Sequence, residues 1–285
     1  MVSATRLDLI RPAERLLLGY LGITVVVGAL RLPEQPAVAW VLVAHGLCAL
    51  LVLLAARPDL GAFGRTVREL YPLLILGALY PAIDVLNNFG GASTHDATVR
   101  GWEHLLFGQD LSRTWWQSAP SVFWSTVLHG AYFAYYPIIL GPLIYFVARG
   151  RLDAARRTTL WVLTTFLVCY LAFLVYPVAG PYYEFPRPDA WFIANAPARL
   201  VYATLAAGSA YGAAFPSSHV AATLVATAAA FRGSRALGAL LVVPAVLLTI
   251  GVVYCQMHYA VDAIAGAVLA VAVVALGSRL EQKHK

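Results

Sequence analysis

Phe215-Pro216-Ser217-Ser218-His219 opens one long apolar run of the sequence, and Tyr254-Cys255-Gln256-Met257-His258-Tyr259-Ala260-Val261-Asp262 opens the last one. Each stretch sets a histidine at the edge of a lipid-soluble segment, and the second adds Asp262 four residues after His258. Ionisable side chains are costly at such an edge and usually serve a function. A carboxylate at that spacing can hold the imidazole in one tautomer, which suits a nucleophile or a base. The two stretches therefore predict chemistry at a membrane surface.

The composition predicts an integral membrane protein. Of the 285 residues, 60% are hydrophobic and only 12% are charged, whereas soluble domains carry about 25% charged residues. At about 20 residues for each span, the chain has room for eight, so we expect an all-α, polytopic transmembrane helical bundle. The apolar runs lie at 13–31, 38–56, 69–88, 122–148, 158–177, 213–231, 236–255 and 259–278.

The distribution of basic residues predicts the orientation of the bundle. With eight spans and a cytoplasmic N-terminus, 15 of the 20 lysines and arginines fall on the cytoplasmic side, as membrane topology favours. Both termini are then cytoplasmic. His219 and His258, 39 residues apart in sequence, come to the same extracytoplasmic end. The first run follows three arginines and lacks a small-residue cleavage site, so we expect it to remain as a signal anchor.

Two regions and two long loops are predicted. Residues 1–65 are expected to form an accessory region of two spans, and residues 66–285 a catalytic core of six. The extracytoplasmic loops are 89–121, in which Trp102, Trp115 and Trp116 indicate an amphipathic interfacial element, and 178–212, which is interrupted by proline and glycine.

Several partner classes are not supported by the sequence. Cys48, Cys169 and Cys255 lack metal-ligand spacing. The formal net charge of +6 is explained by loop arginines that set the orientation, and no basic patch with interleaved aromatics indicates nucleic acid. No cluster of carboxylates suits Mg²⁺, so we expect metal-independent catalysis without a cofactor. No oligomeric state follows from the sequence.

The residues around the histidines suit a phosphate group. Ser217 and Ser218 precede a helix, where serine is a good N-cap and the free amides attract anions. The last span offers a second helix start close by. We expect His258, oriented by Asp262, to attack phosphorus and His219, as imidazolium, to protonate the departing oxygen. A hydroxyl group or water would then accept the phosphoryl group.

Phe-Pro-Ser-Ser-His, followed one span later by His-Tyr-x-x-Asp and Ala-Ile-Ala-Gly, resembles two motifs of the type 2 phosphatidic acid phosphatase and haloperoxidase superfamily. The serine before His219, together with the stretch 176–181 (Tyr-Pro-Val-Ala-Gly-Pro), is more similar to the branch that contains inositol phosphorylceramide synthases. The resemblance covers about residues 120–278. It implies a core of six helices, here the last six spans, with His219 as acid, His258 as nucleophile and Asp262 as its orienting partner.

The chain departs from this family in the groups that clamp phosphate. The family has a lysine and an arginine in its first motif, but here the lysines all lie in the last three residues, and only Arg187 with the proline after it could echo that motif. The arginine that usually stands six positions before the nucleophile is Val252. Other groups must therefore hold phosphate, including Arg100, Arg199 or main-chain amides. The predicted substrate-binding residues are Ser217, Ser218, Arg187, Tyr182, Tyr183 and Asp84. Asp84, near the outer end of the third span, could instead have a structural partner such as His129.

Three functions remain open at this point. The first is a phosphotransferase similar to inositol phosphorylceramide synthases, which moves a phospho-headgroup from a membrane lipid to a lipid or polyol hydroxyl. The second is a lipid phosphate phosphatase with water as acceptor. The third is a proton-coupled transporter, although the polar residues gather at one face instead of the midplane. A non-catalytic scaffold would leave the two motifs unexplained.

Overall fold

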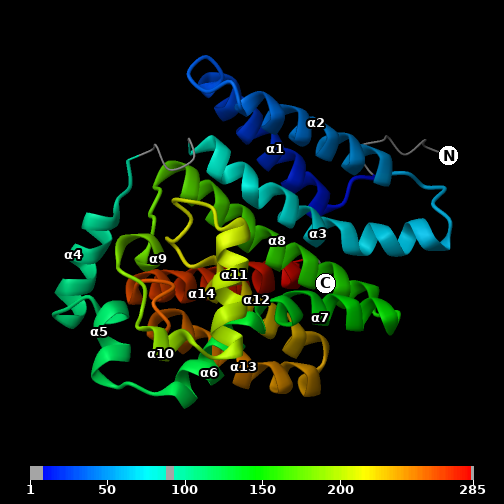
Figure 1. Cartoon of the computed structure of the whole chain (residues 1–285). Helices are drawn as coiled ribbons and strands as arrows, with labels where there is room; N and C mark the ends of the chain where they lie inside the picture. Colours follow the sequence, from blue (N-terminus) through cyan, green and yellow to red (C-terminus); the bar gives the residue numbers. More distant parts are fainter. Residues whose placement is uncertain (1–8, 88–92, 284–285) are drawn as a thin grey trace.

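The computed structural model describes residues 9–87 and 93–283. Within them helices are joined by turns and loops, and the β structure is one isolated bridge between Val178 and Ala213 (Figure 1). This confirms the predicted helical membrane bundle. The helices are α1 (Pro12–Arg31), α2 (Val38–Ala55), α3 (Ala62–Leu86), α4 (Asp96–Phe107), α5 (Leu111–Ser118), α6 (Val122–Phe133), α7 (Tyr135–Ala148), α8 (Leu152–Val175), α9 (Pro181–Glu184), α10 (Ala190–Ile193), α11 (Ala196–Gly208), α12 (Ser218–Gly233), α13 (Arg235–Tyr254) and α14 (Ala260–Lys283).

Seven helical segments of the described chain are long and apolar enough to cross a membrane, one fewer than expected. The difference lies at the expected span 213–231. The helix there begins only at Ser218, after Pro216, and its 16 residues give a length of about 24 Å, less than a bilayer core of about 30 Å. α12 instead packs inside the bundle against α8, α13 and α14. It is therefore a buried central helix.

The expected fourth span is divided into two helices. α6 ends at Phe133 and α7 begins at Tyr135, with Ala134 between them. Pro137 falls in the first turn of α7, where its missing amide costs nothing, whereas inside one continuous helix its ring would clash with the preceding turn. The break therefore follows from the position of the proline.

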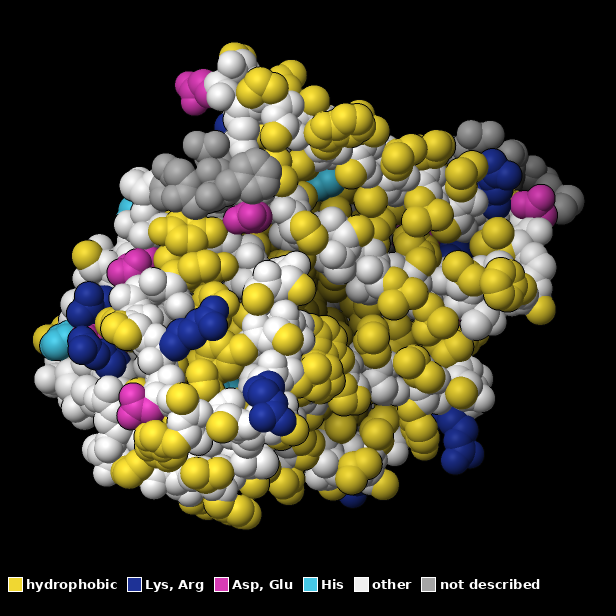
Figure 2. Space-filling model, in the orientation of Figure 1, with side chains coloured by type: hydrophobic (Ala, Val, Ile, Leu, Met, Phe, Trp, Pro, Cys, Tyr) yellow, Lys and Arg dark blue, Asp and Glu magenta, His cyan; other side chains and the backbone are white. Residues whose placement is uncertain are grey.

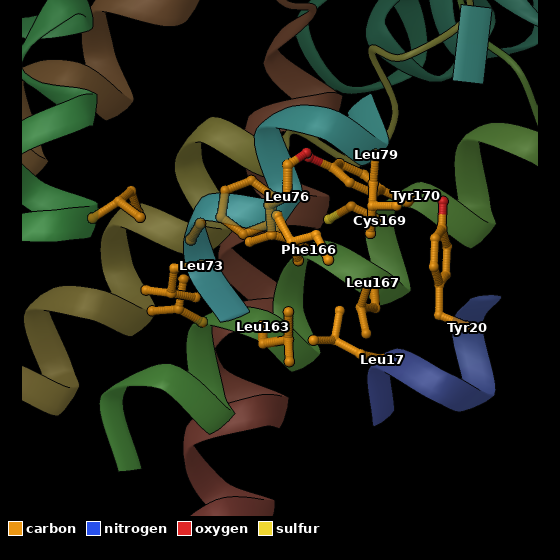
Figure 3. Packing of buried hydrophobic residues seen from close by; sticks show 14 of the residues in the cluster. Leu17, Tyr20, Leu73, Leu76, Leu79, Leu163, Phe166, Leu167, Cys169 and Tyr170 are labelled. Carbon is orange, nitrogen blue, oxygen red and sulfur yellow. The ribbon is translucent and has the colours of Figure 1, made fainter. Parts of the chain in front are cut away.

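The main hydrophobic core joins α1, α3 and α8. Leu17 and Tyr20 of α1 pack with Leu76 of α3 and with Leu163 and Tyr170 of α8 (Figure 3). Burial of each such side chain contributes about 1.5–3 kcal/mol relative to exposure in water. The first span is thus packed against the bundle through ordinary core contacts.

The outer surface between the two ends of the bundle is apolar. Figure 2 shows hydrophobic side chains over this middle part, with charged side chains mainly toward the two ends. Leu30, Trp40, Leu240 and Val271 each expose 70% or more of their surface. Large exposed apolar areas of this kind mark contact with lipid, which agrees with an integral membrane protein.

Short helices fill the two loops that were expected outside the membrane. The first holds α4 and α5, and the second holds α9, α10 and α11. α4, α5, α9 and α10 lie at the left end in Figure 1, where α14 begins. The expected interfacial element is therefore a pair of helices, and Trp116 on α5 is buried.

Candidate active site

The two histidines meet where α12 and α14 begin (Figure 1). His219 is the second residue of α12, and His258 stands two residues before α14. The centroids of the imidazole rings are 5.6 Å apart, and the ring planes are inclined by 57°. His258 is buried and His219 is half-buried. The predicted convergence of the two rings is confirmed.

His258 sits on a tight turn that ends α13. The amides of Gln256 and Met257 donate to the carbonyls of Val253 and Val252 at 3.0 and 2.9 Å, and the amide of His258 also donates to Val252 at 2.8 Å. Gln256 has a left-handed φ of 59°. This pattern closes a helix C-terminus, usually with glycine at the left-handed position.

The side chain of Gln256 holds this turn in place. It accepts a hydrogen bond from the indole of Trp116 at 3.0 Å and donates to the carbonyl of Pro186 at 2.8 Å. Both partners come from the loops that cover this end of the bundle. Sequence reasoning did not single out Gln256, because its partners are 140 and 70 residues away.

Asp262 contacts His258 from the first turn of α14. Its Oδ2 lies 3.4 Å from Nδ1 of His258, a long hydrogen bond, and also accepts the amide of Tyr259 at 2.9 Å. His258 precedes the helix, so the pair does not share one helix face as their spacing suggested. Asp262 instead reaches back to cap the helix start, and the same carboxylate oxygen faces the imidazole.

The start of α14 is already occupied by protein carboxylates. The amide of Ala260 donates to Glu103 of α4 at 2.8 Å, and Glu103 also accepts the amide of Ser112 at 3.3 Å. Together with Asp262, these bonds satisfy the first amides of the helix. The expectation of two free helix starts is therefore wrong, and only the start of α12 is left for an anion.

The start of α12 is held by Ser217 and α14. The Ser217 side chain accepts the amide of Val220 at 3.4 Å, and the Ser217 amide donates to the carbonyl of Asp262 at 3.0 Å. The amides of Ser218 and His219 belong to the first turn, which has no acceptors within its own helix. These two amides are the groups that a phosphate could use.

Asp96, at the start of α4, ties the loops to the turn at His258. Its carboxylate is buried and accepts the amides of Ala179 and Gly180, both at 2.8 Å, and the hydroxyl of Tyr259 at 3.0 Å. Hydrogen bonds to a charged group are the stronger kind. Sequence reasoning missed both Asp96 and Glu103, because they lie in a polar loop where acidic residues are ordinary.

Two tyrosines enclose His219. The ring centroids of Tyr132 and Tyr135 lie 4.8 and 4.5 Å from that of the imidazole. Both rings pack against the imidazole of His219 and limit its orientation. The sequence pattern indicated only packing for these tyrosines, which precede the proline of α7.

A small pocket opens between the histidines and the loop 178–214. It has a volume of about 40 Å³, room for a few water-sized groups by the ~10–15 Å³ that one water needs. No arginine of the described chain lines it. Its polar side chains are those of Tyr80, Tyr132, Tyr182, Tyr183, Ser209, His219 and His258.

The expected substrate-binding residues are divided between the pocket and its surroundings. Tyr182 and Tyr183 line the pocket, whereas Ser217, Ser218 and Asp84 do not. Asp84 accepts the amide of Tyr211 at 3.1 Å, so its hydrogen-bond partner is not His129. The role of all five in binding stays a prediction.

The arginines proposed as phosphate ligands have other partners. Arg187 lies 5.9 and 5.6 Å from the ring centroids of Tyr182 and Tyr202. Tyr182 lines the pocket, but Arg187 itself does not. Arg100 forms a bidentate pair with Asp110, which holds the pKa of that carboxyl below its usual value. Arg199 is exposed and donates to a backbone carbonyl.

Burial sets the protonation state of His258. Removal from water disfavours the imidazolium form and lowers the pKa of His258 to about 4. The ring is therefore neutral at physiological pH, as a nucleophile must be.

These features define the chain as an α-helical integral membrane protein with a histidine pair and a carboxylate at one end of the bundle. Within that class, it belongs to the PAP2 superfamily, whose family model matches residues 101–276. The match runs from α4 to α14 and includes both histidine motifs. No curated protein and no solved structure matches the chain. Membership of the superfamily supports an enzyme of the phosphatase or phosphotransferase type that acts on lipid phosphates.

Proposed function

We propose that the chain transfers a phosphate or phospho-headgroup from a lipid phosphate ester to a hydroxyl acceptor, through a phosphohistidine on His258. The observation that carries this proposal is the pair of imidazole rings, 5.6 Å apart, that face one pocket beside the free helix start of α12. A tetrahedral phosphorus between the rings would meet a nucleophile on one side and an acid on the other.

The reaction has two displacements. His258, with Nδ1 toward Asp262, uses the lone pair of Nε2 to bond phosphorus, and the bond from phosphorus to the lipid oxygen breaks. His219, protonated beside the negative charge of the bound phosphate, gives its proton to that departing oxygen. In the second step His219 removes the proton of the acceptor hydroxyl, which attacks phosphorus and releases His258.

Main-chain amides and tyrosines take the place of the missing phosphate clamp. The amides of Ser218 and His219 supply donors at the positive end of α12. Tyr182 and Tyr183 line the pocket, and the Tyr183 hydroxyl, which now donates to the carbonyl of Ser209 at 3.2 Å, would turn to the phosphate. Arg187, stacked beside Tyr182, adds positive charge behind them.

Hydrolysis, with water as acceptor, is the second candidate function, and the size of the pocket favours it. A volume of about 40 Å³ suits a phosphoryl group and leaves little room for a second alcohol. Transfer to a lipid acceptor would require movement of residues that line the pocket, such as Ser209, Ala210 and Ala213. The location of the site at the extracytoplasmic leaflet belongs to this proposal, and it follows from the distribution of basic residues.

Mass spectrometry of the products distinguishes the two functions. Purified protein is incubated with phospholipids, polyprenyl phosphates and ceramide or diacylglycerol acceptors. New phospho-headgroup lipids support transfer, and free phosphate or a free phospho-headgroup supports hydrolysis. An acid-labile, base-stable label on the wild-type protein, absent from His258→Ala, supports the intermediate. A phosphoryl turnover that persists in His258→Ala contradicts the mechanism.

A further inference from the structure

A large groove lies at the end of the bundle opposite the histidines, between α1, α3, α8 and α14. It has a volume of about 1280 Å³, above the ~300–1,000 Å³ of most small-molecule sites. α8 packs against both α1 and α14 and lines the groove with residues between Asp153 and Val168. On α14 the groove runs from Leu269 to Glu281, about 10 to 29 Å along the helix axis from Asp262, and it shares no lining residue with the pocket at the histidines. The groove is therefore separate from the active site.

The walls of the groove are apolar where they cross the membrane. Val168 of α8 and Leu276 of α14 line it and remain exposed, and so does Ala272. Leu160 and Leu269 also line the groove. These side chains follow the lengths of α8 and α14, two helices long and apolar enough to cross a membrane, which is the geometry that an acyl chain requires.

The end of the groove formed by the starts of α1, α3 and α8 is rich in arginine. The carboxylates there already form ion pairs. Glu14 accepts hydrogen bonds from Nε and Nη2 of Arg68, each at 2.8 Å. Glu69 forms salt bridges with Arg11 and Arg156, each at 2.9 Å. Two buried carboxylates thus satisfy three guanidinium groups. Further arginines in the lining have no comparable partner.

Arg157 and Thr159 present buried donors that lack a partner among the described residues. Nε of Arg157 is buried without a hydrogen bond, and the closest carboxylate, Glu281 at 3.8 Å, is shared with Arg232. The hydroxyl of Thr159, a side chain only 4% exposed, is also unpaired. Both residues line the groove. Buried polar groups are nearly always satisfied. The Arg157 side chain is also 21% exposed, so part of it is accessible from the groove that it lines to a ligand with acceptor oxygens.

We infer that this groove binds an anionic diacyl phospholipid, with its phosphate at Arg157 and its acyl chains along α8 and α14. Arginine suits phosphate because its fork of donors matches two phosphate oxygens. Arg15, exposed at the same rim, adds positive charge toward the headgroup. The basic residues that predict the orientation place this end in the cytoplasmic leaflet, where anionic lipids are abundant.

Native mass spectrometry with added dioleoyl phosphatidylglycerol or dioleoyl phosphatidylcholine tests the inference. The whole chain, purified in detergent, is expected to retain the anionic lipid at least tenfold more tightly. Arg157→Gln should weaken phosphatidylglycerol binding at least tenfold. Its matched control is Arg149→Gln, a nearby arginine that lies over the ring of Tyr145 and outside the groove.

A second variant tests the acyl-chain part without touching a charged group. Ala272→Trp fills the groove from an exposed position, whereas Ala275→Trp changes an exposed position of α14 outside it. Only the first should reduce lipid retention. Equal retention in all four variants and the wild type would overturn the inference, as would equal affinity for the two lipids. Competition by glycerophosphoglycerol as strong as by intact lipid would also overturn it, because the acyl chains would then contribute nothing.

Discussion

Gly266 of α14 packs directly on the carbonyl oxygen of Ser217 at the start of α12. A Cβ atom added at Gly266 would lie 2.5 Å from that oxygen. The amide of Ser217 also donates to the carbonyl of Asp262 at 3.0 Å. The two helix starts are therefore joined backbone to backbone, and this contact fixes the distance between His219 and His258.

Gly266→Ala is expected to lower turnover by at least tenfold. In an ordinary helix this change stabilises by about 1 kcal/mol, but here the added methyl group must displace the start of α12 and His219 with it. Overpacking of this kind costs about 1–3 kcal/mol of stability. Thermal unfolding and activity of the purified variant measure both effects. Gly141→Ala, where the added atom meets nothing within 4 Å, is the matched control: it should leave turnover unchanged and should not lower stability.

Asp262→Asn is expected to reduce turnover by at least a hundredfold while the protein still folds. The amide keeps an oxygen for the amide of Tyr259 but no longer favours the Nδ1–H tautomer of His258. Steady-state rates of the variant, together with the same measurement on His219→Ala and His258→Ala, test this role. General acid or base catalysis contributes about 10²–10⁴-fold. Near-normal turnover in a folded Asp262→Asn protein would assign the carboxylate to helix capping alone.

The stability of the protein is expected to fall between pH 6.5 and pH 4 in a way that depends on His258. Burial lowers the pKa of His258 to about 4, so the unfolded chain binds the proton first as the pH falls, and the folded state loses stability. The full shift corresponds to about 3 kcal/mol. Thermal unfolding of the wild type and of His258→Ala, compared at pH 7.5 and pH 4.5, measures it. The variant should lose less stability on acidification, and identical losses would contradict the prediction.

EDTA is expected to leave turnover unchanged. The carboxylates nearest to the histidines are committed to hydrogen bonds: Asp262 with Tyr259, Glu103 with Ala260, and Asp96 with Ala179 and Gly180. A divalent cation would have to break these bonds to gain oxygen ligands. The measurement is activity after dialysis against EDTA. Strong inhibition that added Mg²⁺ reverses would show that the site uses a metal.

The features predicted from the sequence are those that depend on local pattern. Apolar runs predicted the long helices, and the presence of two antiparallel helices between His219 and His258 predicted that the rings meet. The short central helix was misjudged because the run 213–231 is apolar throughout, and only Pro216 and the serines after it set the start of α12. Hydrophobicity alone does not separate a span from a buried helix.

The contacts that hold the site could not be predicted in this way. Asp96 and Glu103 belong to α4, yet their partners are 83 to 163 residues away, in the 178–180 segment and at the start of α14. Nothing in the local sequence around them differs from a solvated polar loop. The left-handed turn at Gln256 gave no signal either, because glycine is the usual residue there.

Asp96→Asn is expected to destabilise the protein by about 2–4 kcal/mol and to reduce turnover with it. The carboxylate accepts two backbone amides and one phenol, whereas an asparagine has a single acceptor oxygen and points an NH₂ group at a donor. Each lost hydrogen bond to a charged group costs about 1.5–3 kcal/mol. Tyr259 follows His258 directly in sequence, so losing the hydrogen bond from Tyr259 to Asp96 should also make the position of His258 less fixed. We therefore expect kcat to fall more than the folded fraction does. Thermal unfolding and single-turnover rates measure the two effects, with exposed Asp59→Asn as the control. If kcat per folded molecule stayed at the wild-type value, Asp96 would serve stability only and would not position His258.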